Sequence, residues 1–326
     1  MRYMNVLDKI KAPVSTELKQ FNDAFRDTLF SQNPLLEKAV DHLLKAPGKQ
    51  VRPLLVLLSA KLVGKVGDNV LRVALALEML HTASLVHDDV VDESDRRRGL
   101  PSLRAFMSNQ VAVLAGDFIL SKALECAADT GDVRIVRHIA ELGQTLADGE
   151  LLQLENKDSD AFSEAAYFEI ISRKTASLFS ACARLGALAA GGSDAEAERL
   201  AQYGKLIGIC FQLRDDVFDY GTTEIGKPVA GDMREGKLTL PAIYAVVRSD
   251  DDSIHALAQK IRRREATDED IQKLIRFTID EGGIDYAQWH MKDMQGMADG
   301  LIDDTKNAEI AQALHELTAF VGERVL

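Results

Sequence analysis

Apolar residues recur at intervals of three and four along nearly the whole chain, which is the period of helices that bury one face. No Asn-Gly hairpin or alternating strand pattern of convincing length interrupts this pattern. Segments rich in glycine and proline separate the apolar stretches, so the sequence predicts about a dozen helices. Residues 70–91 are nearly all apolar, and we expect this helix in the centre of a bundle.

Nothing like a linker or a low-complexity tract divides the 326 residues, so we predict one all-α domain over residues 1–326. The composition agrees, because 46% of the residues are hydrophobic and only seven are proline. Cys126, Cys182 and Cys210 lie in apolar stretches without metal-ligand spacing. We expect them to be buried thiols in a reducing compartment.

The formal net charge of -12 offers no basic surface for nucleic acid and would be repelled by an anionic membrane. The first nine residues lack the apolar core of a signal peptide. Residues 176–190 are interrupted by Arg184 and are shorter than the ~20 residues of a membrane span. We therefore expect a cytoplasmic protein that is not an integral membrane protein and binds no nucleic acid.

An acidic motif occurs twice in the chain. The copies are Asp88-Asp89-Val90-Val91-Asp92 and Asp215-Asp216-Val217-Phe218-Asp219. In a helix the first and last aspartates of each copy share one face, so their charges repel unless a cation joins them. A pair of carboxylates without His or Cys suits Mg²⁺ bound to phosphate. One such cluster is more often a solvated helix face, but both copies follow apolar segments, which favours a binding site.

Cationic and polar residues surround both motifs. Lys49 and Arg52 are expected at a helix start, where an anion is favoured. His81 lies two turns before the first motif and is equally consistent with a core histidine. Arg97 and Arg98 follow that motif; they either balance its charge or bind a diphosphate. Around the second motif lie Lys174, Thr175, Gln212, Lys227 and Lys237, and the last two predict either a closing lid or solvated lysines.

With these motifs the sequence resembles the trans-polyprenyl diphosphate synthases, from Gly48 to about Pro241. The matching segments are Gly48-Lys49-x-x-Arg52-Pro53, Glu78-Met79-Leu80-His81, Ser84 to Asp92, Arg97-Arg98-Gly99, Gly116-Asp117, Gly149-Glu150, Lys174-Thr175, Phe211 to Asp219, Gly226-Lys227 and Gly236-Lys237. The two residues within the first motif are similar to those of bacterial long-chain synthases of the octaprenyl and decaprenyl type. The resemblance implies an orthogonal helical bundle of the isoprenoid synthase type with a central cavity, and a homodimer.

The resemblance also implies a reaction: head-to-tail (1'-4) condensation of isopentenyl diphosphate with an allylic diphosphate. Asp88, Asp92, Asp215 and Asp219 would hold Mg²⁺, about three ions with the bound diphosphate, and Asp89 and Asp216 would support them. The allylic diphosphate would be bound by Arg97, Lys174, Thr175, Gln212, Lys227 and Lys237, of which Lys174 and Lys227 are also candidate catalytic residues. Isopentenyl diphosphate would be bound by Lys49, Arg52, His81 and Arg98.

The length of the product depends on the cavity below the first motif. Ala83 and Ser84 occupy that turn and are small, which favours a long all-trans product of roughly C40 to C50, a precursor of a quinone side chain. A helix over residues 68–91 would be about 36 Å long, comparable with such a chain. Alternatively these are ordinary packing residues, and a residue such as Leu77 or Phe106 stops the chain.

Several alternatives share some of these features. A farnesyl or geranylgeranyl synthase would differ only in the cavity, and a non-catalytic subunit of a heteromeric synthase typically loses clamp carboxylates, which this chain keeps. A terpene cyclase or a head-to-head synthase would carry a different second motif. Arg324 stands where some relatives end in a basic cluster, and Arg214, beside the second motif, receives no role from the sequence.

Overall fold

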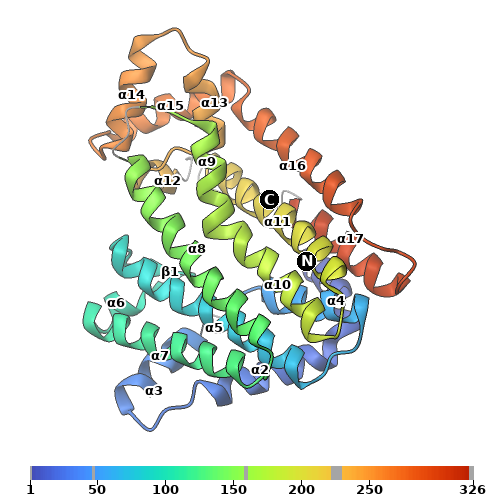
Figure 1. Ribbon diagram of the computed structural model, residues 1–326. Helices are drawn as coiled ribbons and strands as arrows, with labels where there is room; N and C mark the ends of the chain where they lie inside the picture. The colour runs from blue at the N-terminus through green and yellow to red at the C-terminus, as the bar shows by residue number, and fades with distance from the viewer. Residues whose placement is uncertain (1, 46–47, 158–160, 222–229, 323–326) are drawn as a thin grey trace. The chain divides into compact units, whose positions relative to one another are not determined.

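The computed structural model describes residues 2–45, 48–157, 161–221 and 230–322, and these fold almost entirely into helices (Figure 1). The elements of the first part are α1 (Arg2–Lys11), η1 (Ala12–Val14), α2 (Ser15–Thr28), α3 (Pro34–Leu44), α4 (Val51–Val63), α5 (Asp68–Val91), β1 (Arg96–Arg97), β2 (Leu100–Pro101), α6 (Leu103–Phe106) and α7 (Asn109–Ala128). The all-α prediction is confirmed.

The remaining elements are α8 (Val133–Lys157), α9 (Glu164–Ile171), the π-helical turn η2 (Ser172–Ala176), α10 (Ser177–Ala189), α11 (Asp194–Phe218), α12 (Gly231–Arg234), α13 (Leu240–Val247), α14 (Asp252–Arg262), α15 (Asp268–Asp280), α16 (Gly283–Asp299) and α17 (Ala308–Gly322). The expected number of about a dozen helices was too low, since the described residues form seventeen α-helices. Two of these, α6 and α12, have four residues each and carry too little apolar periodicity to be recognised.

One prediction of secondary structure was wrong. Residues 96–101 form a small antiparallel hairpin, in which Arg96 pairs with Pro101 and Arg97 pairs with Leu100. Its turn has positive φ at both Arg98 (50°) and Gly99 (80°), as hairpin turns of two residues require. The Arg-Gly pair at the turn lacks the Asn-Gly or Asp-Gly signal, so the strands were not predicted.

The chain divides into two compact units, each assembled from separate stretches. The first comprises Met1–Gly143, Leu178–Gly204 and Ile302–Glu316, and the second Gln144–Ser177, Lys205–Leu301 and Leu317–Leu326. The single domain over residues 1–326 stays a prediction.

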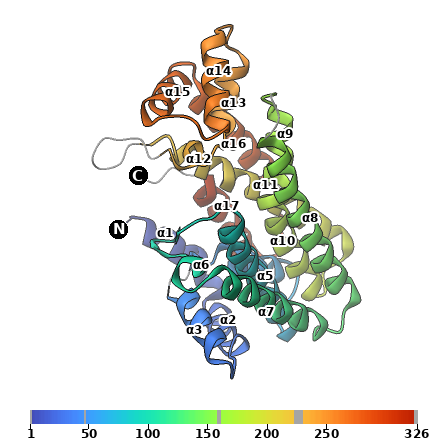
Figure 2. The same ribbon diagram turned by 90° about the vertical axis from the view of Figure 1, so that its left-hand side faces the viewer.

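In the first unit α5 is the core helix and lies beside α7 and α4 (Figures 1 and 2). Leu77 and Met79 of α5 are fully buried, as are the small residues Ala112 and Ala123 on α7, so the two helices approach closely and exclude water. The bounds of α5, residues 68–91, are those expected from the apolar run. Among the described helices only α5 is long and apolar enough to cross a membrane, yet 67% of that stretch is buried within the structure, as in a core helix.

The second unit buries the end of α11 against α9, α13 and α16. Leu213 and Val217 of α11 pack with Tyr167, Leu240 and Met291. A second apolar cluster joins α13, α14 and α15, which lie together in Figure 2. This packing fixes the helix end that carries the second acidic motif.

All three cysteines are buried and unbridged, as the sequence predicts. Burial raises the pKa of the Cys126 thiol and raises that of Cys210 to about 12. A protonated, buried thiol is a poor nucleophile and a poor metal ligand. The cysteines therefore contribute to packing rather than to chemistry.

Candidate active site

The first acidic motif lies at the C-terminal end of α5. Asp88 is in the last turn, whereas Asp92 is the residue that caps the helix, and its N–H donates to the carbonyl of Asp88 at 2.8 Å. Both side chains are partly exposed, while Asp89 between them is buried. Asp92 keeps helical φ and ψ (-81° and -2°), so it continues along the path expected for a helix.

Asp89 is held by Arg97 of the hairpin. The Nε and Nη2 atoms of Arg97 both donate to Oδ1 of Asp89, at 2.9 and 2.6 Å. Burial raises the pKa of the Asp89 carboxyl, and the Arg97 hydrogen bonds oppose that shift. Asp89 therefore anchors a guanidinium beside the motif, and its role in supporting the metal ligands stays a prediction.

The hairpin is fixed by its flanking residues. Nη1 of Arg104 donates to the carbonyl of Glu93 (2.6 Å) and to the carboxylate of Asp95 (2.9 Å). The Ser102 hydroxyl donates to the Ser94 carbonyl at 2.6 Å. These bonds hold both ends of the hairpin and so set the position of its three arginines, Arg96, Arg97 and Arg98.

A cavity of about 250 Å³ in the first unit is lined by Gly48, Glu78, Asp89, Arg97 and Arg98, among other residues. A Cβ on Gly48 would lie 2.8 Å from a guanidinium nitrogen of Arg98, so a larger residue there would displace that side chain. The structure thus brings together Arg97 and Arg98 in one cavity, on the motif side of α5.

His81, Arg52 and Arg98 lie close enough to influence one another's charge. Burial lowers the pKa of His81 well below its usual value, and the charges of Arg52, Arg98 and Arg97 lower it further. Burial also raises the pKa of Glu78, against the opposing effect of Arg52 and Arg98. Of the residues predicted to bind isopentenyl diphosphate, Arg52, His81 and Arg98 therefore lie near one another, with Glu78 beside them, a residue to which the sequence assigned no role.

Lys49 is the exception within this set. We expected Lys49 and Arg52 at one helix start, but α4 begins at Val51 after Gln50, which has φ of 58°. Arg52 is in the first turn, whereas Lys49 precedes the helix and is exposed. The apolar pattern starts at Val51, and this start, rather than the glycine at position 48, defines the helix.

The depressed pKa of His81 predicts a pH effect on stability. The unfolded chain binds a proton at position 81 below about pH 6.5, whereas the folded state resists it, so stability should fall as pH decreases below 6.5. In the wild-type protein this effect should lower the free energy of unfolding by up to ~1.4 kcal/mol for each pH unit below 6.5. We expect His81→Gln to abolish this part of the pH dependence. Urea unfolding of both proteins at about pH 7 and about pH 5.5 measures it.

A matched control is His138→Gln, which removes a partly exposed histidine paired with Glu141 at 3.3 Å. Its unfolding free energy should follow the wild-type pH dependence. Equal pH slopes for His81→Gln and the wild-type protein would contradict the assignment. Comparison of the variants isolates His81 from Glu78, whose raised pKa acts in the opposite direction above pH 4.5.

The second motif lies at the end of α11, which runs to Phe218. Asp215 is exposed and Asp216 is buried, so the copy repeats the alternation of the first motif. Asp219 follows the helix, and its N–H donates to the carbonyl of Asp216 at 3.2 Å. In both motifs the second aspartate is buried and the outer aspartates are at least partly exposed, although the carboxylate of Asp219 also accepts hydrogen bonds from two backbone N–H groups.

Asp216 is the centre of a hydrogen-bond network. The Tyr167 hydroxyl donates to its Oδ2 and Gln212 Nε2 donates to its Oδ1 at 2.8 Å. Oε1 of Gln212 accepts from the Thr175 hydroxyl at 2.8 Å. Burial and the charge of Asp232 raise the pKa of Asp216 well above its usual value, against the effect of the two hydrogen bonds. Tyr167 is therefore a site residue that the sequence did not reveal.

Lys174 and Thr175 are carried by the π-helical turn η2. Such turns are frequent at functional sites. The Lys174 ammonium pairs with Glu150 at 2.6 Å and donates to Gln153 at 2.9 Å. A Cβ on Gly149 would lie 3.1 Å from the backbone nitrogen of Lys174. Glycine thus lets α8 approach the turn, which explains the Gly149-Glu150 segment in physical terms.

Asp219 binds the start of α12. Its two carboxylate oxygens accept from the N–H groups of Gly231 (2.7 Å) and Asp232 (2.9 Å), as expected at a helix N-terminus. Burial and the charge of Asp219 raise the pKa of Asp232 to about 7. Asp232 is a second acidic group of this site that the sequence did not reveal.

The lysines after the second motif are only partly described. Lys237 Nζ pairs with the Glu235 carboxylate at 2.7 Å, and the backbone N–H of Lys237 donates to the backbone carbonyl of Asp232 at 2.8 Å. It lines a cavity of about 100 Å³ together with Gln212, Asp216 and Asp232. Lys227 and Arg324 lie outside the described residues, so their predicted roles stay predictions.

The two residues whose small size is expected to allow a long product, Ala83 and Ser84, lie on α5 before the first motif. Ala83 is 2% exposed, and Ser84 is partly buried with its hydroxyl bonded to the carbonyl of His81 at 2.9 Å. A larger side chain at position 83 would have to enter space enclosed by the fold. Ala83 is therefore the more sensitive of the two positions.

The donor sets of the motifs suit a hard divalent cation. Each motif offers partly exposed carboxylate oxygens at a helix end, with no His or Cys among its aspartates. Among the described residues, no three His, Cys, Asp or Glu side chains already converge as a metal site. Each pair fits an ion that keeps other ligands on water or on phosphate oxygens, as Mg²⁺ does.

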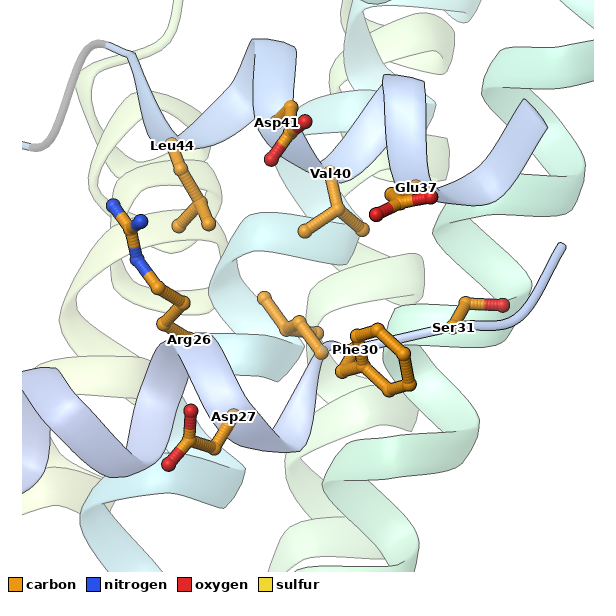
Figure 3. Close-up of a pocket in the computed structure, with 9 residues that line it drawn as sticks. Arg26, Asp27, Phe30, Ser31, Glu37, Val40, Asp41 and Leu44 are labelled. Carbon is orange, nitrogen blue, oxygen red and sulfur yellow. The ribbon is translucent and has the colours of Figure 1, made fainter. Parts of the chain in front are cut away.

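A larger cleft of about 460 Å³ lies between α2 and α3 and shares Arg26, Leu29 and Leu44 with the lining of the first-unit cavity. Figure 3 shows Phe30 and Val40 beside Arg26 and Asp41 in this cleft. It contains none of the predicted site residues. Size alone therefore does not identify the site, and the chemistry is carried by the smaller cavities.

The chain is similar to known proteins over most of its length. The family model described as polyprenyl synthetase matches residues 33–278. The octaprenyl diphosphate synthase of Haemophilus influenzae is 35% identical over 323 residues, covering 98% of this chain and 97% of that protein.

Two solved structures share the fold over nearly the whole chain. A polyprenyl synthase from Caulobacter crescentus, complexed with calcium and isoprenyl diphosphate, has a TM-score of 0.90 at 34% identity and covers 98% of both chains. A geranylgeranyl pyrophosphate synthase from Bacteroides thetaiotaomicron has a TM-score of 0.86 at 40% identity, covering 98% of this chain and 100% of that one. The predicted isoprenoid synthase type of helical fold is thereby confirmed.

Proposed function

This chain belongs to the polyprenyl synthetase family of prenyltransferases, and on that premise we propose that it makes a long all-trans polyprenyl diphosphate. The reaction joins isopentenyl diphosphate head to tail (1'-4) to an allylic diphosphate. The observation that carries the proposal is the repeated acidic motif. Each copy ends a buried helix with partly exposed outer carboxylates and one buried, hydrogen-bonded aspartate.

We assign the allylic diphosphate to the aspartates and their neighbouring cations. Asp88, Asp92, Asp215 and Asp219 would bind Mg²⁺, which supplies positive charge to the departing diphosphate. The cationic and polar residues proposed for the same group are Arg97, Lys174, Thr175, Gln212, Lys227 and Lys237. In the described set, Lys174 and Lys237 are paired with glutamates, so binding would exchange those partners for phosphate oxygens.

Isopentenyl diphosphate is assigned to the basic cluster of the first unit, formed by Lys49, Arg52, His81 and Arg98. The charges of three arginines lower the pKa of His81, so this cluster has an excess of positive charge that could bind a second diphosphate. A neutral His81 can still donate one hydrogen bond through its ring. Two separate cation sets fit a reaction with two anionic substrates.

The residues act by stabilising charge. As the allylic C1–O bond breaks, negative charge grows on the diphosphate, where Arg97 and Lys174 are proposed to stabilise it. The C4 carbon of isopentenyl diphosphate then bonds to the allylic C1, and a proton leaves C2. The released diphosphate is the proposed acceptor of that proton, since no side chain of the two motifs is an obvious base for it.

A long product, roughly C40 to C50, is favoured by the small residues at positions 83 and 84 and by α5, whose 24 residues span about 36 Å. The similarity to an octaprenyl synthase agrees, and such a product would serve as a quinone side-chain precursor. The alternative is a shorter product, because a geranylgeranyl synthase is also similar. A non-catalytic subunit is disfavoured, since both motifs retain every aspartate.

The test is incubation of the purified protein with Mg²⁺, labelled isopentenyl diphosphate and farnesyl diphosphate, followed by separation of the products by length. We expect elongation that stops when EDTA is added. No elongated product would exclude the catalytic function. Products that end near C20 would exclude the long-chain assignment and leave the family activity intact.

We also propose a homodimer, supported by apolar side chains that α7 leaves exposed. Val113 and Leu124 are eleven residues apart, so they lie on one face three turns apart, and they are 39% and 45% exposed; Leu114 beside them is 64% exposed. Exposed large apolar side chains that recur along one helix are typical of subunit interfaces.

Leu124→Lys is expected to convert the dimer to monomers at micromolar concentration, because a charge would be buried in the interface. Sedimentation velocity measures the change. Leu35→Lys is the matched control, since Leu35 is 57% exposed but lies on α3, and it should leave the dimer intact. A Leu124→Lys dimer as stable as wild type would contradict this interface.

A further inference from the structure

Arg214 precedes the second motif and is one of the few buried cations of the second unit. Its side chain is 6% exposed, whereas that of Asp215 is 46% exposed. Burying a guanidinium is costly unless its charge and N–H groups are satisfied. The partners of Arg214 therefore show what the fold gains from placing it there.

Two aromatic rings hold the guanidinium in place. Its carbon lies 4.8 Å from the ring centre of Phe211 and 5.8 Å from that of Phe218. These residues stand three before and four after Arg214 on α11, so all three share one helix face. Contact with both rings restricts the orientation of the guanidinium and hence the direction in which its N–H groups point.

The two ends of the guanidinium fork reach different elements. Nη2 donates to Oδ1 of Asp215 at 3.0 Å, and Nη1 donates to the backbone carbonyl of Phe320 at 3.3 Å. Phe320 lies in the last turn of α17, where carbonyls lack partners within the helix and a cation is favoured. One side chain thus joins the motif to the end of α17.

The contact with Asp215 joins two neighbouring residues of α11. Neighbouring residues of a helix point in directions about 100° apart and do not normally face each other. An exposed aspartate without this contact would sample several rotamers in water. Since a carboxylate has two oxygens with about four acceptor positions, a bond from Arg214 to Oδ1 leaves capacity for a metal ion.

We propose that Arg214 is a positioning residue that orients the Asp215 carboxylate for Mg²⁺. Because Arg214 also donates to the Phe320 carbonyl, this orientation depends on whether the C-terminal end of α17 is packed in place. The inference rests on the proposed function, because it takes Asp215 as a ligand. Residues that support metal ligands typically contribute roughly 10–100-fold to metal affinity or activity. The expected effect is therefore on metal binding rather than on folding alone.

The experiment compares Arg214→Met and Arg214→Lys with the wild-type protein. Calorimetric titration of Mg²⁺ in the presence of inorganic diphosphate gives the metal affinity, and product formation gives the half-saturating Mg²⁺ concentration. Arg214→Met should weaken both by roughly 10–100-fold. Arg214→Lys should weaken them less, because an ammonium keeps the charge but lacks a fork that serves both Asp215 and Phe320.

Arg248→Met is the matched control. Like Arg214, Arg248 lies over an aromatic ring, with its guanidinium carbon 5.2 Å from the ring centre of Tyr244. Unlike Arg214, it is exposed, at the C-terminal end of α13. Its Mg²⁺ affinity should stay within about 2-fold of wild type. A double-mutant cycle with Asp215→Asn tests whether Arg214 acts through Asp215. If it does, replacing Arg214 in the Asp215→Asn protein should cause little further loss of Mg²⁺ affinity.

Unchanged Mg²⁺ affinity in a folded Arg214 variant would overturn the inference, as would full additivity with Asp215→Asn. If Arg214→Met does not fold, Arg214→Lys carries the same comparison. A wild-type protein that forms no product would overturn the proposed function instead. The calorimetric titration would still report on Arg214 in that case, so the two failures are distinguishable.

Discussion

Asp88→Asn is expected to lower prenyl transfer at least about 100–1000-fold, the cost of removing one preorganised electrostatic contact to a departing group. The substitution keeps the size of the side chain but removes the charge that we assign to Mg²⁺. Asp88 is partly exposed at the end of α5, so the fold should not depend on it. Asp215→Asn should have a comparable effect through the second motif.

The measurement is the initial rate of isopentenyl diphosphate incorporation at saturating Mg²⁺, with thermal unfolding to confirm the fold. Glu93→Gln is the matched control, because it removes one negative charge next to the first motif from an exposed residue. Its rate should remain within a few-fold of wild type. An Asp88→Asn protein with the rate of the Glu93→Gln control would exclude the first motif as the metal site.

Ala83→Phe is expected to shorten the product from roughly C40–C50 to about C20 or less, since the aromatic ring would enter the space proposed for the growing chain. Ala83 lies five residues before Asp88 and is buried, so the new side chain cannot turn into water without strain. The added bulk should also destabilise the fold by about 1–3 kcal/mol. The condensation itself should persist, because the motifs are unchanged.

The products are separated by chain length after removal of the diphosphate, with farnesyl and geranyl diphosphate as primers. Ala83→Ser serves as the control, because it adds a single atom and should keep the wild-type length. A folded Ala83→Phe protein that still makes the full-length product would place the limiting residue elsewhere on the chain.

The helices that could be predicted are those whose own sequence determines them. The bounds of α5 followed from one long apolar run, and the body of the helix is buried as that run predicts, whereas its motif end is partly exposed. The start of α4 was misplaced by two residues, because Lys49 was expected at the start of the helix that begins at Val51. Local pattern therefore defines a helix more reliably than it defines the helix end.

The residues that could not be predicted are those defined by contacts between distant segments. Tyr167 meets Asp216 across 49 positions, and Arg214 meets Phe320 across 106. Neither tyrosine nor arginine carries a local signal for such a partner. The acidic motifs were found because their spacing is itself the signal, whereas their supporting residues required the fold.

The hairpin after the first motif has a consequence for how charge is distributed. Arg97 reaches back to Asp89, while the guanidinium of Arg98 packs against Gly48. The chain reverses direction at Arg98 and Gly99, which have positive φ. A run of three arginines that would form one block of repulsive charge on a helix is thereby split, and adjacent residues can serve two different anions.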